Sequence, residues 1–239
     1  EVARALYNAM HDRRPALIVR AANEADVVAA VDYAREHGMD VAIRSGGHNV
    51  AGLGSIDGGL VIDMTRIDDI ELDTRARTVR VGGGAHWGQV DAATHQAGMA
   101  TPSGIISTTG VAGLTLGGGF GYLSRKYGLT IDNLLSARIV TANGELVTAS
   151  DRENPDLFWA IRGGGGNFGV VTSFEFRMYP VETVYGGPIF FPAAAGADIL
   201  AFYRDFVTTA PRELGLFFGF HEAPPAPFVP EALHGAKAC

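Results

Sequence analysis

The chain has 239 residues, of which 47% are hydrophobic and 19% charged, so it is expected to fold as a globular protein. Its formal net charge is −7 and it has no basic run that suits a phosphate backbone, so nucleic acid is not an expected partner. No apolar stretch reaches the ~18 residues that a membrane-spanning helix needs, so a membrane is not an expected partner either.

The only cysteine, Cys239, is the last residue, which excludes an intrachain disulfide and a cysteine-based metal site. A chain with so little cysteine fits a reducing compartment. The first residues also lack the basic-then-apolar order of a signal peptide, and we therefore expect a cytoplasmic protein. Residues 1–4 have the pattern of a helix interior, so we expect the natural chain to start earlier.

Residues 15–66 are expected to form a first α+β subdomain. Asn23 is a typical helix N-cap, Gly38 a typical helix end, and short apolar runs predict strands. The expected elements in chain order are a strand over 16–20, a helix between Asn23 and Gly38, and strands over 41–44 and 60–63. The second of these strands leads directly into Ser45-Gly46-Gly47-His48-Asn49.

Residues 69–178 are expected to form a second, larger subdomain. Asn143-Gly144 between two strand-like runs predicts a hairpin, and Asn154-Pro155 predicts a helix start with the asparagine as cap. The expected elements in chain order are a strand over 78–81, a helix over 86–97, strands over 136–141 and 145–148, a helix over 156–162 and a strand over 170–178.

The sequence changes character after Tyr179-Pro180. Apolar runs over 189–191 and 216–220, with a helix near 197–209 between them, predict the β-α-β start of another sheet. The proline-rich stretch 223–230 comes before that sheet could close. We therefore divide the chain into a domain over 1–180 and an incomplete domain over 181–239, and expect the natural chain to continue.

Glycines gather in three clusters, at 46–47, 104–121 and 163–169. In the first, a tight turn can direct successive N–H groups toward an anion such as a pyrophosphate. The second is too rich in glycine for an ordinary helix and too apolar for a solvated loop, so we expect its backbone to approach a flat, buried ligand. The plain alternative for a single cluster is a turn or a strand crossing, which accounts less well for three clusters.

Several familiar motifs are absent or misplaced. Gly164-x-Gly166-x-x-Gly169 fits GxGxxG, but the expected helix precedes it and the strand follows, which reverses the order of the dinucleotide fingerprint. The sequence contains no GxxxxGK[ST] and no GxSxG, which excludes a P-loop and a nucleophile elbow. No pair of carboxylates has a spacing that indicates a site.

His48 stands out among the seven histidines because two glycines precede it beside the expected anion site. The residues alone leave three roles open for it: a reactive group, a hydrogen-bond partner of phosphate, or an ordinary loop residue. His86 and His95 fall near one helix but not three or four residues apart, so no metal site is expected.

Four segments together resemble the berberine-bridge-enzyme-like flavin oxidases of the vanillyl-alcohol-oxidase and p-cresol-methylhydroxylase superfamily. They are R-S-G-G-H-N at 44–49, T-G-V-A-G-L through G-F-G at 109–121, Y-G-L-T-I-D-N at 127–133 and L-F-W-A-I-R through G-V-V at 157–171. The resemblance implies an α+β fold: a p-cresol-methylhydroxylase-type FAD-binding domain of two α+β subdomains, followed by the start of a substrate-domain sheet.

The resemblance also implies which residues bind FAD. The histidine at position 48 would bond to the 8α carbon of the flavin, the loop 45–49 and the turn 107–110 would hold the pyrophosphate, and Val171 would lie by the adenine. The full implied set is Arg44, Ser45, Gly46, Gly47, His48, Asn49, Ser107, Thr108, Thr109, Gly110, Gly113, Gly118, Gly121 and Val171. No catalytic residue is identified.

Two positions separate branches of the family. Some members form a second bond to FAD through a cysteine, but that position is Ile106 here, so a single bond is implied, as in the branch that resembles 6-hydroxy-D-nicotine oxidase. The position that influences oxygen access in relatives is Thr109.

The implied activity is hydride transfer from an alcohol or amine carbon of a small organic substrate to FAD, with O₂ as acceptor. The alternatives are an FAD-dependent dehydrogenase with another acceptor, and a flavin-binding fragment without turnover.

Overall fold

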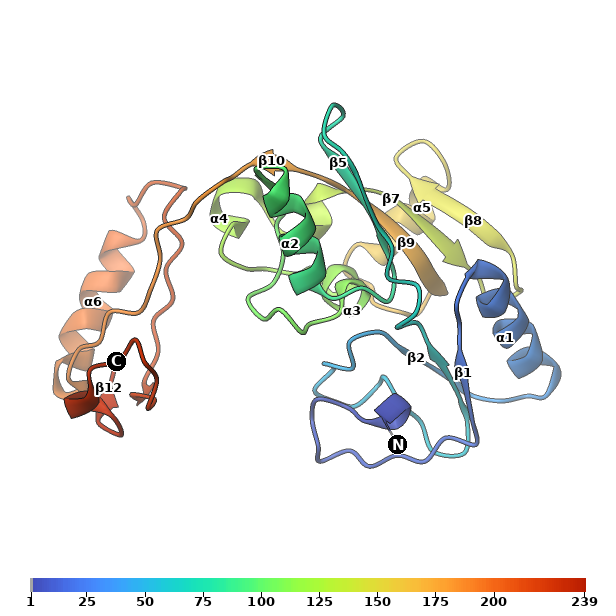
Figure 1. The fold of residues 1–239 in the computed structure, drawn as a ribbon, viewed down its shortest axis with the longest axis horizontal. Coiled ribbons are helices and arrows are strands. Elements are labelled where there is room, and N and C mark those ends of the chain that lie inside the picture. The colour runs from blue at the N-terminus through green and yellow to red at the C-terminus, as the bar shows by residue number, and fades with distance from the viewer. Residues whose placement is uncertain (1) are drawn as a thin grey trace. The chain divides into compact units, whose positions relative to one another are not determined.

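The computed structural model describes residues 2–239 and divides into two compact units, residues 1–182 and 183–239 (Figure 1). Each unit has its own elements and is described by itself. Within the described chain, no helix combines the length and the apolar character that crossing a membrane requires. A one-turn 3-10 helix, Val2–Arg4, begins the first unit.

A small parallel sheet forms the first half of this unit. Its strands are β1 (Leu17–Arg20), β2 (Val41–Arg44) and β3 (Leu60–Asp63), in the order β1-β3-β2, and α1 (Glu24–Glu36) connects β1 to β2. The side chain of Asn23 accepts from the backbone N–H of Asp26 at 3.0 Å, which caps α1. The four predicted elements of this region are confirmed.

A five-stranded antiparallel sheet forms the second half. Its order is β4-β5-β9-β7-β8, and its strands are β4 (Ile70–Asp73), β5 (Thr78–Gly82), β7 (Leu134–Val140), β8 (Leu146–Ser150) and β9 (Val170–Arg177). Two-residue strands β6 (Met99–Ala100) and β10 (Tyr179–Pro180) pair beside it. The predicted hairpin is confirmed, since β7 and β8 pair around the turn with Gly144.

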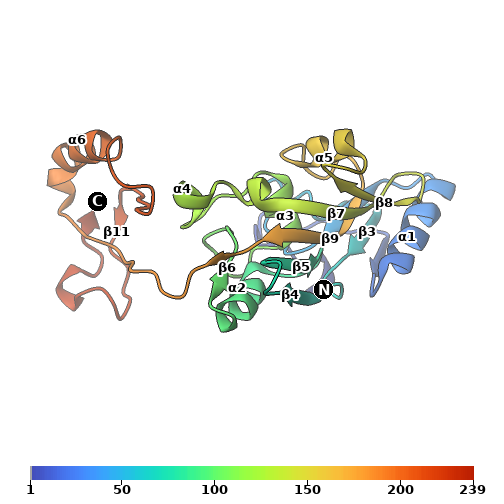
Figure 2. The ribbon, with the colours of Figure 1, turned by 90° about the horizontal axis from the view of Figure 1, so that it is seen from above.

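Three helices cover one face of the large sheet: α2 (Trp87–Gln96), α3 (Val111–Leu116) and α5 (Pro155–Ile161). Helix α2 contacts β4 and α5 contacts β8, so they lie toward opposite edges of the sheet (Figure 2). Trp87, Phe174 and Phe176 are among the largest fully buried side chains in this core. The short α4 (Ser124–Tyr127) and a 3-10 turn, Thr130–Asn133, lead into β7.

Helix α1 packs between the two sheets. Successive strand residues point to opposite faces, so Ile139 belongs to the core under α2, α3 and α5, while its neighbour Val140 packs with α1 and β3. On the α1 face, Arg138 forms two hydrogen bonds of 2.7 Å with Glu24, which also accepts from the Thr172 hydroxyl at 2.8 Å. Helix α1 thus joins the small sheet to the large one.

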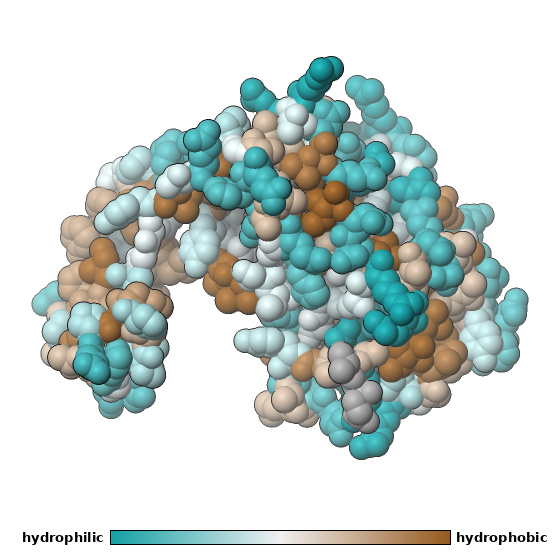
Figure 3. Space-filling view, viewed as in Figure 1, coloured by the Kyte–Doolittle hydropathy of each residue, from teal (hydrophilic) through white to brown (hydrophobic). Residues whose placement is uncertain are grey.

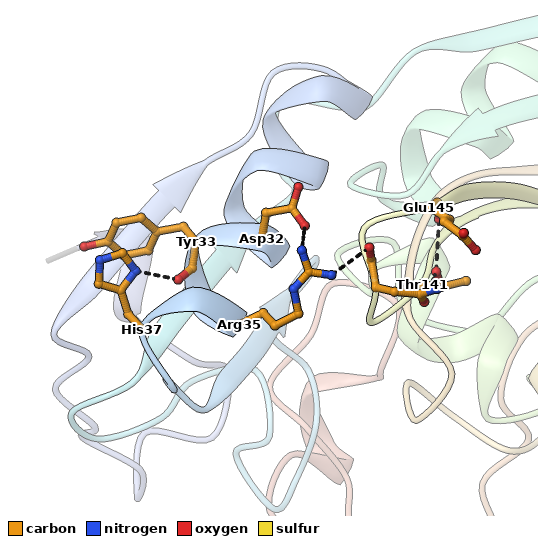
Figure 4. Close-up of polar contacts among 7 residues, drawn as sticks. Asp32, Tyr33, Arg35, His37, Thr141 and Glu145 are labelled. Carbon is orange, nitrogen blue, oxygen red and sulfur yellow. Dashed lines mark hydrogen bonds and ion pairs between the residues drawn. The ribbon is translucent and has the colours of Figure 1, made fainter.

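The end of α1 makes a second junction with the large sheet. Figure 4 shows Arg35 reaching from α1, where it pairs with Asp32 at 2.7 Å, to the turn between β7 and β8, where it donates to the Asn143 carbonyl at 2.8 Å. Thr141 in this turn donates to the Glu145 carbonyl at 3.2 Å. The junction therefore involves backbone as well as side chains.

Some expectations for the first unit are wrong in detail. The glycine segment was expected not to be helical, yet residues 111–116 form α3, because the N–H of Val111 donates to Ala85 and the turn continues from there. Asn154 precedes α5 but does not cap it with its side chain, which instead donates to the Thr148 carbonyl at 2.7 Å. Strands β4, β6 and β10 were not predicted.

The second unit contains α6 (Gly196–Phe206) after a 3-10 turn over Ala193–Ala195, a short ladder of β11 (His221–Glu222) with β12 (Lys237–Ala238), and a 3-10 turn over Glu231–Leu233. The predicted helix is confirmed in its core. The predicted strands over 189–191 and 216–220 are wrong, because neither run forms a strand in the described chain. Phe191 exchanges two backbone hydrogen bonds of 3.0 Å with Cys239, but this pairing does not extend into a ladder along the run. Their apolar side chains stay exposed, including Ile189 at 77% and Phe217 at 60%.

Candidate functional site

His48 lies in the loop that follows β2, half-buried between two neighbours. Its Nε2 is 3.0 Å from the Thr108 hydroxyl, and the ring of Tyr7 stacks on the imidazole with 4.3 Å between the ring centres. Both neighbours are distant from His48 in the sequence. The fold therefore fixes the ring from one edge and one face.

The surroundings of His48 favour a neutral imidazole. Partial burial lowers the pKa of His48 below its usual value, and the nearby charge of His86 lowers it further. Below neutral pH, His48 therefore stays unprotonated, with a free lone pair on one ring nitrogen, over a wider pH range than a free histidine does. A ring nitrogen with a free lone pair can act as a nucleophile.

Two glycine loops cross beside His48 with backbone against backbone. A Cβ on Gly46 would fall inside contact distance of the Gly110 nitrogen, and a Cβ on Gly110 would collide with the Gly46 nitrogen and the Ser45 hydroxyl. Only glycine fits at either position, for the plain steric reason that no space exists for a side chain. The crossing brings the loop after β2 onto the turn before α3.

The turn before α3 is held by the start of α2. The backbone N–H of Trp87 donates to Thr109 at 3.0 Å, and that of Gly88 donates to Ser107 at 2.9 Å. His86 and Gly110 form an isolated antiparallel bridge. These bonds use N–H groups that the first turn of a helix leaves without intrahelical partners, so they fix the position of Thr108.

The loop after β2 keeps donors available for a ligand. Within the described chain, the backbone N–H groups of Gly46, Gly47 and His48 donate to no acceptor. The Ser45 hydroxyl is buried and has no hydrogen-bond partner among the described residues. Successive free N–H groups and an unpaired hydroxyl fit an anionic group such as a pyrophosphate.

The second glycine cluster divides into open and packed positions. A Cβ on Gly113 or Gly118 would meet no atom within 4 Å, so both positions leave space beside the backbone. A Cβ on Gly121 would instead collide with the Ser103 carbonyl, so chain packing accounts for that glycine. The open positions fit a flat ligand that approaches the main chain.

Hydrophobic patches interrupt the hydrophilic surface of the molecule (Figure 3), and in this cluster Phe120 is 59% exposed.

Three other predicted residues have structural partners. Arg44 lies 3.7 Å from the buried Asp63 and donates to the Ala5 carbonyl at 3.2 Å. The Asn49 side chain accepts from the backbone N–H of Leu53 at 3.1 Å. Val171 is buried in the core of the large sheet. Their roles toward a cofactor stay predictions.

A cavity of about 210 Å³ opens at the carboxyl edge of the small sheet, lined by Ala3, Arg20, Arg44, Asp63 and Thr65. Pockets for drug-sized ligands occupy about 300–1,000 Å³, so this cavity is too small to hold a dinucleotide. Within residues 2–239, no three histidine, cysteine or carboxylate side chains gather in a way that could hold a metal ion.

Sequence reasoning missed three features of this site. Tyr7 gave no signal, because its contact with His48 depends on how the N-terminal segment folds back. His86 was considered only as a metal ligand, whereas it influences the charge state of His48. The run Gly82-Gly83-Gly84 was visible in the sequence, and a Cβ on Gly83 would collide with the Val171 carbonyl.

The free donors, the glycine crossing and the open backbone agree with a match to a known family. A family model described as an FAD binding domain matches residues 15–150. The chain belongs to this family. FAD is therefore its cofactor, and the p-cresol-methylhydroxylase-type fold inferred from the sequence is confirmed.

Relatives of this family member include FAD-linked oxidoreductases and oxidases. (R)-6-hydroxynicotine oxidase of Paenarthrobacter nicotinovorans is 42% identical over 174 residues, which are 73% of this chain and 38% of the relative. The crystal structure of 6-hydroxy-D-nicotine oxidase from Arthrobacter nicotinovorans superposes with a TM-score of 0.83 and 38% identity, over 86% of this chain and 46% of that one.

A third similar protein is glucooligosaccharide oxidase from Acremonium strictum, which carries a 6-S-cysteinyl, 8α-N1-histidyl FAD. Its structure superposes with a TM-score of 0.76 and 32% identity, over 87% of this chain and 45% of that one. The chain thus spans less than half the length of the relatives that it matches.

Proposed function

We propose that this chain is the flavin-binding part of an FAD-dependent oxidoreductase and that His48 carries the FAD through a single covalent bond. The observation that supports this most directly is the fixed imidazole of His48, whose pKa partial burial lowers, beside the crossing of Gly46 and Gly110. Residues 1–180 would be the FAD-binding domain, and 181–239 the start of a substrate-binding domain.

Each loop has a proposed task in holding the cofactor. The free N–H groups of residues 46–48 and the Ser45 hydroxyl bind the pyrophosphate, together with the turn 107–110. The backbone at Gly113 and Gly118 gives the ring system room. Ile106 occupies the position at which some relatives carry a second linking cysteine, and its aliphatic side chain can form no such bond.

The proposed reaction of the whole enzyme is the oxidation of an alcohol or amine carbon of a small organic substrate. Bound FAD supplies a hydride acceptor, and the protein binds and orients the reacting groups. O₂ is the proposed final acceptor, because the similar proteins named above are oxidases. Thr109, at the position that the resemblance connects with oxygen access, follows Thr108 in the turn and accepts from the Trp87 N–H.

The test is a spectroscopic titration of the full-length protein. Candidate substrates are added without oxygen, and we expect the yellow flavin band to bleach and to recover when air is admitted. The matched control is the same protein without substrate, whose band should persist. If no alcohol or amine substrate bleaches acid-stable flavin in the protein, the proposed reaction is wrong.

The second candidate function is an FAD-dependent dehydrogenase with a different electron acceptor. Thr109 occupies the position that the resemblance connects with oxygen access. The identity of this residue does not by itself decide whether O₂ reaches the flavin, so a different acceptor is a second candidate. Bleaching without recovery in air, followed by recovery with a quinone, would identify it. A flavin-binding part without turnover is the outcome if only the full-length protein bleaches and the 239-residue chain does not.

A further inference from the structure

The Thr108 hydroxyl is the polar partner of His48 in this site. It approaches Nε2 at 3.0 Å, while Nδ1 makes no hydrogen bond to any described residue. The Tyr7 ring covers one face of the imidazole. Thr108 is itself held from behind, since the backbone carbonyls of Ser107 and Thr109 on either side accept from the first turn of α2.

A neutral imidazole has one N–H and one lone pair, and only the nitrogen with the lone pair can bond to carbon. If Thr108 donated to Nε2, the proton would lie on Nδ1, which has no acceptor among the described residues. If Nε2–H donates to the Thr108 oxygen, the only N–H is satisfied and Nδ1 keeps a free lone pair. The second arrangement pairs the only ring N–H with a fixed protein acceptor, and the hydrogen bond that one ring nitrogen makes sets the tautomer of a histidine.

We propose that Thr108 is a positioning residue for cofactor attachment: its hydroxyl accepts the Nε2–H of His48 and so selects Nδ1 as the nitrogen that bonds to the flavin 8α carbon. This inference rests on the proposed function. It assigns the side chain of Thr108 a task separate from that of the turn backbone, which faces the pyrophosphate in the proposed site.

Attachment of FAD to His48 conserves all atoms and electrons. One bond forms between Nδ1 and the 8α carbon, and two bonds break, the C–H of that carbon and the Nε2–H of His48. The electron pair that is released passes through the cofactor to O₂, which takes up the two protons and becomes H₂O₂. Thr108 lies at the nitrogen from which the second proton departs: its oxygen accepts from Nε2–H before the bond forms, and its hydroxyl can donate to the bare Nε2 afterwards.

The experiment compares Thr108→Val, Thr108→Ser and His48→Ala in the full-length protein, prepared without flavin and then mixed with FAD. The fraction of chain with FAD attached is followed in time by intact mass after acid precipitation. Valine keeps the shape of threonine but cannot accept the hydrogen bond, and serine can. The matched control is Thr74→Val, the same change at an exposed turn between β4 and β5.

We expect Thr108→Val to slow attachment by about tenfold, the effect of losing one hydrogen bond at the reacting ring. Thr108→Ser and Thr74→Val should stay within about threefold of the natural protein on the same reasoning. Attachment by Thr108→Val at the natural rate would overturn the proposal. Slowing by serine equal to that by valine would also overturn it.

A second measurement keeps the test independent of folding defects. Histidine labelled with ¹⁵N in the flavin-free protein reports which ring nitrogen of His48 carries the proton, and we expect Nε2 in the natural protein. A proton on Nδ1 overturns the proposal. Failure of the proposed function is distinguishable, since the natural protein would then bind FAD without any acid-stable mass, and His48→Ala would be no different.

Discussion

His86 influences His48 through charge, which would make the proposed attachment of FAD sensitive to pH. Its proximity helps to lower the pKa of His48, after the larger effect of burial. Because the folded state then binds this proton less readily than the unfolded chain, His48 reduces the free energy of unfolding as pH falls below about 6.5 and has no such effect above it.

We therefore expect His86→Gln to raise the pKa of His48, since a neutral side chain replaces one that becomes cationic. The rate of FAD attachment should then begin to fall at a higher pH than in the natural protein, while its plateau at alkaline pH stays the same. The measurement is the attachment rate between pH 5 and 8. Superimposable profiles for the two proteins would contradict the assigned influence of His86.

Prediction from sequence succeeded for residues whose roles depend on their immediate neighbours. Gly46 and Gly110 were identified as positions with a backbone task, and the structure brings them into contact. Tyr7 escaped prediction because a stacking partner distant in the chain leaves no local pattern. Sequence likewise named Thr108 only as part of a turn, since which ring nitrogen it meets depends on the docking of two loops.

Among the elements, α1 carries a polar junction with the large sheet. Glu24 accepts hydrogen bonds from Nε and Nη2 of Arg138 and from the Thr172 hydroxyl. The hydrogen bonds from Arg138 lower the pKa of Glu24, against the opposing effect of burial. A carboxyl with a lowered pKa in the folded state stabilises the protein above its ordinary value and loses that effect as pH falls through the folded pKa.

We expect Glu24→Gln to lower the free energy of unfolding by about 1 kcal/mol at pH 7, the size of a partly exposed bidentate pair with one added hydrogen bond. Below pH 4 the difference from the natural protein should shrink. Urea denaturation at both pH values measures it. The control is Glu71→Gln, whose exposed pair with Arg80 spans 3.5 Å and should matter less. Equal losses in both variants would contradict the importance given to the α1 junction.

Element prediction was accurate where apolar periodicity and end signals agreed, as for α1 with Asn23 and Gly38. It was wrong over 189–191 and 216–220 because an apolar run indicates a strand only if a second strand satisfies its backbone. It missed α3 because the glycines of this segment argue against a helix. The hydrogen bond from Val111 to Ala85, which ties the start of α3 to the segment before α2, leaves no signal in the sequence. In each failure a tertiary contact outweighed local preference.

For the whole chain, both hydrophobic cores are made only of residues before 182. The second unit buries mainly small side chains, among them Ala210, Ala223 and Ala238. We therefore expect a chain of residues 1–182 to fold and to bind FAD, with a melting temperature within about 4 °C of that of the 239-residue chain, the shift that ~1 kcal/mol causes at this size. Calorimetry and acid-stable FAD measure both. Aggregation, or loss of FAD binding, would show that the first unit depends on the second.

The bare backbone contact between Gly46 and Gly110 has a thermodynamic consequence. One loop extends from the parallel sheet and the other is anchored on the antiparallel one, so the pyrophosphate donors and the turn come together only while the two sheets are docked. A ligand that binds only this docked form stabilises it according to its concentration and affinity. Bound FAD is therefore expected to stabilise the docking of the two halves of the domain, and the proposed covalent bond at His48 would make this stabilisation independent of the free FAD concentration.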